Sequence, residues 1–272
     1  MDQIHSGKEY WERRLGTDFD FRGVGISALG RGYNQWLYQV RAIAFDRVIR
    51  WLQLDWPRVD VLDIGSGTGF YIKQWNRLGV HSVTGTDITQ IAVDTLRTQF
   101  ASGNIEQLDI TTPSLPDAVR QRSYDVASAF DVLFHIKDDD DYTRALQNIH
   151  TILAPKGYLL YSDTFPRKIG EHRKTLVHRT LDEVTDHLQA AGFRIIGSFP
   201  MFLVMNRPTD ETSFLWRFGW RLMTLPVRVW DPLGWALGAI YFLPEAFLVS
   251  LARSSPTTKI MICQKAGNEG VG

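Results

Sequence analysis

The sequence has little of what marks an exported protein, a metalloprotein or a nucleic-acid-coating protein. It contains one cysteine, Cys263, so no intrachain disulfide can form, and no cysteine and histidine spacing matches a zinc site. Its 30 basic and 30 acidic side chains cancel, so no overall field draws the chain to a nucleic-acid backbone. The first residues lack the apolar run of a secretory signal. We therefore expect a cytoplasmic protein that binds no nucleic acid.

Apolar residues, by contrast, are plentiful. They make up 44% of the 272 positions, which is enough to bury the core of one large domain or two small ones. Tryptophan is unevenly distributed: four of the nine tryptophans lie within twenty residues near the C-terminus, at positions 216, 220, 230 and 235. The only basic residue type in this stretch is arginine. The tryptophan-rich stretch requires an explanation of its own.

Short apolar runs alternate with helical stretches from residue 58 to about 199, a pattern typical of parallel β-α units. A further strand follows after an interruption of about fifty residues. The expected strands are 59–64, 80–87, 104–110, 124–130, 158–163, 193–199 and 258–264. The expected helices of this part are 68–78, 89–100, 139–153 and one that opens with a capping box at 180–183 and runs to 191.

The sharpest motif is a glycine-rich loop between the first strand and the first helix. Gly65, Gly67 and Gly69 stand at alternate positions. Glycines let the backbone turn sharply and let a ligand approach without Cβ atoms in the way. Asp63, two residues before the first glycine, would repel a pyrophosphate but attract an ammonium or sulfonium group. The loop therefore predicts a nucleotide-like ligand that carries positive charge.

Two more carboxylates follow the next strands. Asp87 ends the second strand, where a carboxylate can accept hydrogen bonds from two ribose hydroxyls. Asp109 ends the third strand between Leu108 and Ile110, which suits the amino group and ring of an adenine. Together with the glycine loop, these acids predict an adenosine-binding cavity at one edge of the sheet.

These motifs resemble those of the class I S-adenosylmethionine-dependent methyltransferases. Residues 63–69 (DIGSGTG) look like the family's first motif, Asp87 like its ribose acid and 108–110 like its adenine-side motif. Residues 123–136 are similar to its fourth-strand segment and 153–160 to the turn into its fifth strand. The resemblance implies S-adenosylmethionine as the cofactor. It also implies an α/β, Rossmann-like fold: a seven-stranded, mostly parallel sheet with an antiparallel last strand and helices on both faces.

Three parts of the chain are expected. Residues 1–57 form an N-terminal helical lid or substrate cover, with an amphipathic helix over 36–52. Residues 58–206 and 257–266 form the S-adenosylmethionine-binding core. Residues 207–256 form a hydrophobic helical insertion between strands six and seven.

His135 is the expected catalytic residue, since it lies just beyond the fourth strand at the edge where ligands bind in such sheets. A neutral imidazole there can take a proton from a hydroxyl acceptor, although packing over the cofactor or a backbone hydrogen bond explains it equally well. Four residues of the lid are expected to meet the methionine carboxylate or shield the methyl group, unless the lid helix only packs on the sheet. They are Tyr10, Arg31, Tyr33 and Tyr38. The complete set of expected cofactor contacts is Asp63, Gly65, Ser66, Gly67, Gly69, Asp87, Ile88, Asp109, Ile110, Phe130, Tyr33 and Arg31.

Other chemistries lack their residues. The Asn/Asp-Pro-Pro-Tyr/Phe signature of enzymes that methylate amide or adenine nitrogens is replaced by residues 129–132 (AFDV). Cys263 falls in the predicted last strand, so no cysteine nucleophile is in place. Asp131 and Asp163 loosely fit a metal-assisted reaction, but no third ligand is in view and no metal is expected. The basic loop 167–174 either holds an anionic group of the acceptor or is solvated.

We therefore expect an enzyme that methylates a small, apolar or aromatic metabolite, on oxygen rather than on nitrogen or carbon. The alternatives are an acceptor in a membrane, such as a lipid or quinone, and a cofactor-binding partner protein without catalysis. Residues 212–252 are expected either to cap the substrate cavity or to make a peripheral membrane contact. Pro244 and Glu245 are expected to end the apolar run 232–244 before it can span a bilayer.

Overall fold

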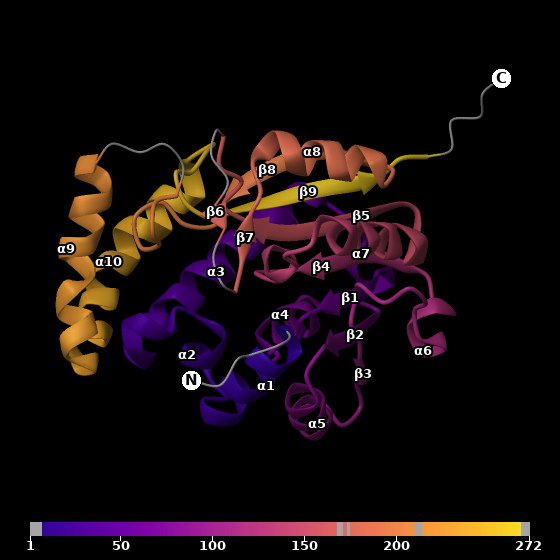
Figure 1. Ribbon diagram of the computed structural model, residues 1–272, viewed down its shortest axis with the longest axis horizontal. Coiled ribbons are helices and arrows are strands. Elements are labelled where there is room, and N and C mark those ends of the chain that lie inside the picture. The colour runs from indigo at the N-terminus through magenta and orange to yellow at the C-terminus, as the bar shows by residue number, and fades with distance from the viewer. Residues whose placement is uncertain (1–6, 168–170, 173–174, 210–213, 268–272) are drawn as a thin grey trace.

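A seven-stranded sheet forms the centre of the structure, a computed structural model that describes residues 7–167, 171–172, 175–209 and 214–267. The strand order is β3-β2-β1-β4-β5-β9-β8. All neighbouring strands are parallel except for the two pairs that β9 forms with β5 and β8. The predicted mostly parallel sheet with an antiparallel last strand is therefore confirmed (Figure 1).

The observed strands follow the predicted ones closely. They are β1 (Asp60–Ile64), β2 (Ser82–Asp87), β3 (Asn104–Gln107), β4 (Tyr124–Ala129), β5 (Leu153–Asp163), β8 (Phe193–Pro200) and β9 (Lys259–Lys265). Strand β5 begins earlier than predicted. Tyr124 pairs with Leu153 and Val126 with Tyr158, so the residues between Leu153 and Tyr158 form an irregularity within the strand instead of a separate turn.

A small antiparallel ribbon was not expected from the sequence. It consists of β6 (Glu171–His172) and β7 (Val177–His178) and lies in the segment that follows β5. Parts of the basic loop 167–174 fall outside the described residues, so the expectation that it holds an anion concerns atoms that the structure does not describe.

Helices cover both faces of the sheet, as predicted. On one face, α3 (Gly30–Leu52), α4 (Phe70–Leu78) and α5 (Gln90–Gln99) contribute to one hydrophobic core, and on the other α7 (Asp139–Ile152) and α8 (Leu181–Ala190) contribute to a second. Four short helical segments complete the core and its approaches. They are η1 (Ser27–Leu29), η2 (Trp56–Arg58), α6 (Asp117–Arg120) and η3 (Leu133–His135).

Side-chain caps fix where several helices begin. The predicted capping box is present: Glu183 N donates to Thr180 Oγ1 at 3.3 Å, and Thr180 N donates to Glu183 Oε2 at 2.7 Å. Asp141 N donates to Asp138 Oδ1 at 3.0 Å at the start of α7. These caps fix the residues at which α7 and α8 begin after the parallel strands β4 and β5.

Two N-terminal helices, α1 (Gly7–Thr17) and α2 (Phe21–Val24), lie against this edge (Figure 1). Glu12 of α1 accepts a hydrogen bond from Gln90 N at 2.6 Å, so its carboxylate meets the positive N-terminal end of α5. Arg14 donates to Gly25 O at 2.6 Å and holds α1 against the segment before α3. The division of the chain into a lid and a core stays a prediction.

The insertion forms two long helices, α9 (Phe214–Val229) and α10 (Asp231–Leu251), at one end of the molecule (Figure 1). The expectation that Pro244 and Glu245 end the apolar run is wrong, because α10 continues through both to Leu251. Glu245 is buried, and its carboxylate accepts hydrogen bonds from Leu203 N at 2.7 Å and Val204 N at 2.9 Å. The backbone donors therefore compensate the charge of Glu245, so this residue can be buried within the helix.

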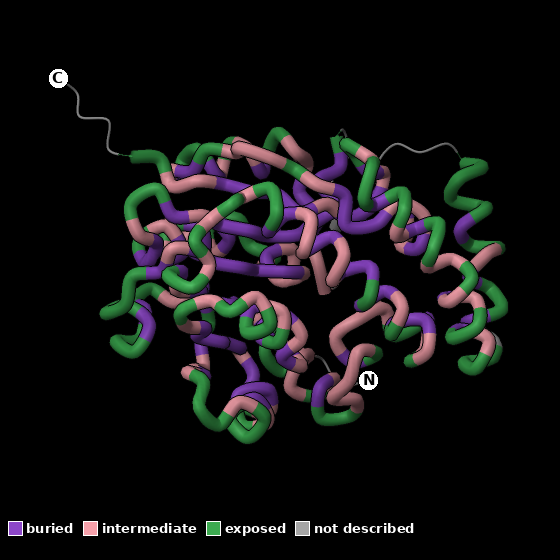
Figure 2. Tube along the Cα trace, turned by 180° about the vertical axis from the view of Figure 1, so that it is seen from behind, coloured by how far each residue is buried: buried purple, intermediate pink, exposed green. Residues whose placement is uncertain are grey.

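By length and composition alone, α10 could cross a bilayer, although such a helix is weak evidence for a span. One face of α10 packs along α3. A Cβ on Gly238 would lie 2.4 Å from Trp36 Cδ1, so only glycine allows the two helices to approach this closely. Outside this contact, most of α9 and α10 is exposed (Figure 2).

Candidate functional site

A cavity of about 680 Å³ lies at the carboxyl edge of the sheet, and we call it the sheet-edge cavity. The loops that follow β1, β2, β3 and β4 form its floor, and α1 forms part of its cover. Nine of the predicted site residues line it. They are Gly65, Ser66, Gly67, Asp87, Ile88, Asp109, Ile110, Phe130 and His135.

The glycine loop forms the tightest part of this cavity. Gly65 has a φ of 67° and Gly67 a φ of 53°, which L side chains rarely adopt. A Cβ on Gly65 would lie 2.4 Å from Val132 Cγ2. The loop is tied to the second strand, since Ser66 N donates to Thr86 O at 2.8 Å. Backbone groups therefore line this wall of the cavity, as the sequence predicted.

Asp63 is placed beneath the loop and does not line the cavity, which corrects the expectation that it meets the ligand. Its carboxylate accepts hydrogen bonds from Ser66 Oγ at 2.8 Å and from Ser128 Oγ at 2.6 Å. Burial raises the pKa of Asp63 to about 6, against the two serine hydrogen bonds, which lower it. Its contacts position Ser66. Gly69 also lies outside the lining, at the start of α4.

Asp87 lies on the wall of the cavity and is almost fully buried. It accepts hydrogen bonds from Gly67 N at 2.9 Å and from Thr89 N at 2.9 Å, so it links the glycine loop to the start of α5. Burial raises the pKa of this carboxyl, although these hydrogen bonds oppose the shift. Asp109 is exposed at the mouth and accepts from Thr111 N at 2.9 Å. Asp87 and Asp109 thus both line the cavity, the first buried and the second exposed to solvent.

Aromatic rings close the other end. Phe130 stacks on Tyr71 with ring centroids 4.0 Å apart, and Tyr38 lies 4.8 Å from Phe70. All four rings line the cavity. The sequence motifs pointed to Phe130, and Tyr38 was weighed as a shield for the methyl group. Tyr71 was not expected, although its place one residue into α4, after the glycine loop, could have suggested it.

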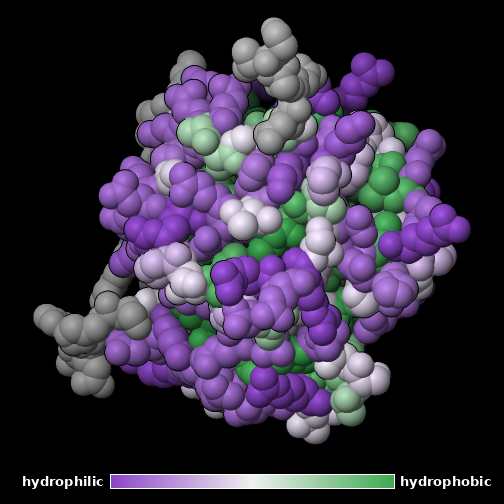
Figure 3. All heavy atoms as spheres, turned by 90° about the vertical axis from the view of Figure 1, so that its right-hand side faces the viewer, coloured by the Kyte–Doolittle hydropathy of each residue, from purple (hydrophilic) through white to green (hydrophobic). Residues whose placement is uncertain are grey.

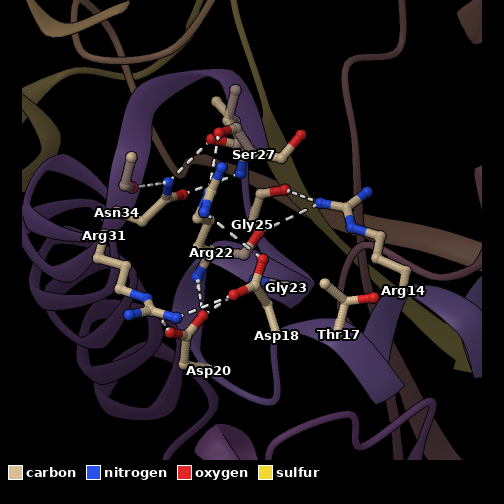
Figure 4. A network of polar contacts seen from close by, with 12 residues as sticks. Arg14, Thr17, Asp18, Asp20, Arg22, Gly23, Gly25, Ser27, Arg31 and Asn34 are labelled. Atoms are coloured by element: carbon tan, nitrogen blue, oxygen red, sulfur yellow. Dashed lines mark hydrogen bonds and ion pairs between the residues drawn. The ribbon is translucent and has the colours of Figure 1, made fainter. Parts of the chain in front are cut away.

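Arg31 and Tyr33 do not line this cavity, which corrects the expectation that these two residues of the lid contact the cofactor. Helix α3 begins at Gly30, earlier than the predicted residue 36, and turns both side chains away. Arg31 is 63% exposed and pairs with Asp18 and Asp20 at 2.9 Å and 2.6 Å (Figure 4). Tyr33 is fully buried and donates to Met205 O at 3.1 Å. Arg31 therefore stabilises the N-terminal segment, and Tyr33 ties α3 to the segment after β8.

His135 lies where the sheet-edge cavity meets a second cavity. Its Nδ1 is 2.9 Å from Thr175 O. Since a carbonyl oxygen can only accept, Nδ1 carries the hydrogen, and Nε2 of the neutral ring is left as an acceptor. Burial lowers the pKa of His135 to about 4, against the backbone hydrogen bond, which raises it. The ring is therefore neutral at pH 7 and a weak proton acceptor.

The second cavity, of about 530 Å³, adjoins the first and shares Tyr10, Trp11, Asp131 and His135 with it. We call it the arginine cavity. Five arginines and two aspartates are among its lining residues. They are Arg14, Arg41, Arg207, Arg221 and Arg228, with Asp131 and Asp163. Among the described residues that line this cavity, guanidinium groups outnumber carboxylates, which gives this part of a chain of zero net charge a local excess of positive charge.

Asp131 stands between the two cavities in a strained conformation. Its φ is 60°, which is unusual for any residue but glycine. Its carboxylate pairs with Arg41 of α3 and accepts a hydrogen bond from Ser162 Oγ at 2.7 Å. On the same cavity wall, the imidazole Nδ1 of His178 contacts the Asp163 carboxylate.

Arg41 was missed by the sequence analysis, although a signal was present. It lies on the same helical face as Leu37, Ala44 and Val48, all buried. An arginine within such an apolar stripe requires a buried partner, which the sequence alone did not identify. In the residues that the structure describes, no group of three or more histidine, cysteine, aspartate or glutamate side chains is placed to hold a metal ion.

Comparison with known proteins finds similar methyltransferases over part of the chain. Residues 62–161 match a family described as methyltransferase domain. The chain is 25% identical over 120 residues to a ubiquinone biosynthesis O-methyltransferase of Neisseria meningitidis serogroup C (strain 053442), covering 43% of this chain and 47% of that protein. It is 30% identical over 103 residues to a ribosomal protein L11 methyltransferase of Geobacter metallireducens, covering 38% and 31%. The chain thus spans less than half the length of either relative.

The likeness of fold extends over nearly the whole chain. The structure of magnesium protoporphyrin IX methyltransferase from Synechocystis PCC 6803, which has S-adenosylmethionine bound, matches with a TM-score of 0.57. The match covers 98% of this chain and 100% of that one at 13% sequence identity. At this identity the likeness shows the fold alone. The acceptors that the names of the three proteins give differ, so these similarities do not define an acceptor for this chain.

Proposed function

We propose that the chain is a class I S-adenosylmethionine-dependent methyltransferase, as its fold and its match to a methyltransferase domain over residues 62–161 support, and that it methylates an oxygen of a small acidic molecule. The cofactor supplies an electrophilic methyl group on a sulfonium centre. Because the transfer is an in-line displacement, the protein mainly has to bind, align and shield the two reactants. The arginine cavity is the observation that carries the choice of acceptor.

The sheet-edge cavity suits the cofactor. A ligand can approach the backbone at Gly65 and Gly67, where side chains would strain or fill the loop. We assign the ribose hydroxyls to Asp87, and the adenine to the segment that includes Ile88, Asp109 and Ile110. The aromatic end, with Phe130, then surrounds the methyl-bearing part and excludes water. Asp63 acts through Ser66 and is a positioning residue.

The arginine cavity suits an anionic acceptor. It adjoins the sheet-edge cavity at Asp131 and His135, so a molecule bound there faces the cofactor. Arg221 and Arg228, which line it and are exposed, can hold a carboxylate or phenolate by charge-assisted hydrogen bonds. Trp11, Phe134 and Trp220 provide apolar walls in the same cavity. The acceptor we propose therefore combines an acidic oxygen with an apolar or aromatic body.

The state of His135 supports an acidic oxygen over an alcohol. A group with a pKa of about 4 takes little of the proton of an alcohol at pH 7. A carboxylate, however, needs no base, because its oxygen has already lost its proton at pH 7, and a phenol, with a pKa of about 10, gives up its proton to water or to a bound base more readily than an alcohol does. We propose that Nε2 of His135 accepts a hydrogen bond from the acceptor or packs over the cofactor, and so orients the reaction.

Transfer of a labelled methyl group tests the proposal. The protein is incubated with methyl-labelled S-adenosylmethionine and, in separate reactions, an aromatic carboxylic acid, a phenol and an aliphatic amine. We expect label in the organic phase with the acid or the phenol. Alkaline hydrolysis then distinguishes the products, since a methyl ester releases labelled methanol and an aryl ether does not. Transfer to the amine alone would refute methylation on oxygen, and cofactor binding without transfer to any of the three acceptors would favour a non-catalytic binding protein.

A further inference from the structure

Exposed apolar side chains are concentrated at one end of the molecule. Among the described residues, all but one of the large apolar side chains that are exposed lie between positions 214 and 251, and the exception is Trp51. We call this group the insertion face. It consists of Phe214, Leu215, Trp216, Phe218, Leu222, Leu225, Trp230, Trp235, Ile240, Leu243, Phe247, Leu248 and Leu251.

The size of the insertion face sets it apart from an ordinary protein surface. Phe214, Leu215 and Leu243 are exposed by 77%, 76% and 72%. At roughly 100 Å² for each such side chain, the face presents on the order of 1,000 Å² of apolar area, above the roughly 300–600 Å² of the largest patch on a typical monomer. The opposite end of the molecule is mainly hydrophilic (Figure 3). A surface of this kind marks a site of interaction.

The arrangement of charge on α9 identifies the partner. At 100° per residue, Arg217, Arg221 and Arg228 fall within about 40° of one another and form one row along the helix. Phe218 and Leu222 lie beyond the row on its outer side, between roughly 60° and 160° from Arg217. The buried residues Trp220, Thr224 and Val227 lie on its inner side. The arginines therefore separate the apolar outer side of α9 from the body of the protein.

We propose that the insertion face docks on a lipid bilayer that contains anionic lipids. The apolar side chains enter the boundary between headgroups and acyl chains, and the arginine row lies at the level of the phosphates. The exposed charged residues between 214 and 253 are four arginines, Arg217, Arg221, Arg228 and Arg253, and one acid, Asp231. This charge complements an anionic surface. A two-fold dimer would instead bring two such arginine-rich faces together.

The geometry favours a helix pair that lies on the bilayer over one that spans it. The side of α10 that carries Gly234, Gly238 and Glu245 is buried against the rest of the protein. Glu245 is fixed to the backbone of Leu203 and Val204. Crossing a membrane would require α10 to leave these contacts, whereas surface docking preserves them and buries only side chains that are now exposed.

Docking also narrows the acceptor class, and this step rests on the proposed function. Arg221 and Arg228 of the row line the arginine cavity as well. The cavity therefore adjoins the level at which lipid headgroups would lie. An amphiphile with its acidic group at the headgroups and its apolar body in the acyl layer would meet the arginines first. We assign the acceptor to this class of anionic, membrane-resident amphiphiles.

Flotation with vesicles tests the docking surface. We expect the full chain to float with phosphatidylcholine vesicles that contain phosphatidylglycerol, and to float less with phosphatidylcholine alone or at high salt. The triple variant Phe218→Gln, Leu222→Gln and Leu243→Gln should bind these vesicles at least about tenfold more weakly. Its affinity for S-adenosylhomocysteine should not change. The matched control is Trp51→Gln, which removes an exposed aromatic side chain outside the insertion face and should float like the parent.

Each other outcome overturns a stated part of the proposal. Failure of the parent to float, or equal flotation of the triple variant, would refute membrane docking. A dimer in sedimentation velocity that the triple variant dissociates, without flotation, would assign the face to a second copy of the chain. Methylation of water-soluble acids by a protein that does not float would leave the proposed function standing and remove the docking. Flotation without methylation of any acid would do the reverse.

Discussion

The sheet-edge cavity and the arginine cavity adjoin at Asp131 and His135, but different kinds of chain segments and chemical groups line them. Loops at the ends of four neighbouring strands form most of the sheet-edge cavity, and backbone groups and carboxylates line it. The arginine cavity instead collects side chains from α1, α3, α9 and the segments after β4 and β5. The first type of cavity follows from a local motif, whereas the second exists only once distant segments have packed. Cofactor binding and acceptor choice are thus separable in this chain.

The largest expected effect concerns the glycine loop. Gly65→Ala places a Cβ at a φ of 67° and 2.4 Å from Val132 Cγ2. The glycine loop must then shift, which narrows the space for the cofactor in the sheet-edge cavity. We expect the affinity for S-adenosylhomocysteine, measured by calorimetry, to fall about 100-fold, while vesicle binding is kept.

Gly79→Ala is the matched control for this variant. Gly79 has a similar φ of 77°, but a Cβ there would meet nothing within 4 Å. Both variants carry a similar backbone penalty of about 1 kcal/mol, and only the first should lose cofactor affinity. Equal cofactor affinities of the two variants would show that the loop at Gly65 does not hold the cofactor.

A smaller effect is expected in the arginine cavity. The double variant Arg221→Gln and Arg228→Gln should raise the KM for an acidic acceptor about tenfold and leave the affinity for the cofactor unchanged. The effect is modest because both arginines are largely exposed and their charges are screened by solvent. Arg31→Gln is the control, because Arg31 is exposed and ion-paired outside both cavities. If a neutral ester of the acceptor lost the same factor, the arginines would not be recognising its charge.

The smallest effect concerns Asp63, whose pKa is raised from 3.8 to about 6 by burial. The folded protein holds this proton more tightly than the unfolded chain, so the favourable contribution is complete below pH 3.8 and is lost as the pH rises through about 6. Asparagine does not titrate. From about pH 5 to about pH 8, the free energy of unfolding of the parent should fall by about 1 to 2 kcal/mol relative to Asp63→Asn.

Urea unfolding of the ligand-free protein at several pH values measures this difference. A difference that is constant across the range would mean that Asp63 is not held in a costly ionised state. Because Asp63 lies beneath the glycine loop, the result bears on the sheet-edge cavity and should leave the arginine cavity unaffected.

The fold was largely predictable, because each β-α unit carries its own local signals. The capping box at Thr180 and Glu183 and the glycines at 65 and 67 set boundaries through neighbouring residues. The errors arose where local patterns compete with packing. Pro244 would end or kink an isolated helix and Glu245 would bring a charge into its packed side, yet α10 continues through both, with the charge of Glu245 compensated by backbone donors from Leu203 and Val204.

In the candidate site, the residues at the ends of strands were predictable from the sequence, and those placed by helix packing were not. Nine of the expected residues line the sheet-edge cavity, since the ends of parallel strands meet at one edge. Arg31 and Tyr33 were assigned wrongly because the start of α3 determines where they point. The pairing of Arg41 with Asp131 joins residues 90 positions apart, and no local sequence pattern predicts it.

The amino-acid sequence determined the order of strands and helices, the glycine loop and the acids that follow it, because these depend on contacts between residues close in the chain. The sequence also showed the tryptophan-rich stretch, but it did not show whether these side chains are buried or exposed. Tertiary packing decided that α9 and α10 stand side by side with their apolar residues outward, and that five arginines meet in one cavity. The physical reason is that exposure and local charge are properties of the assembled surface, to which widely separated residues contribute.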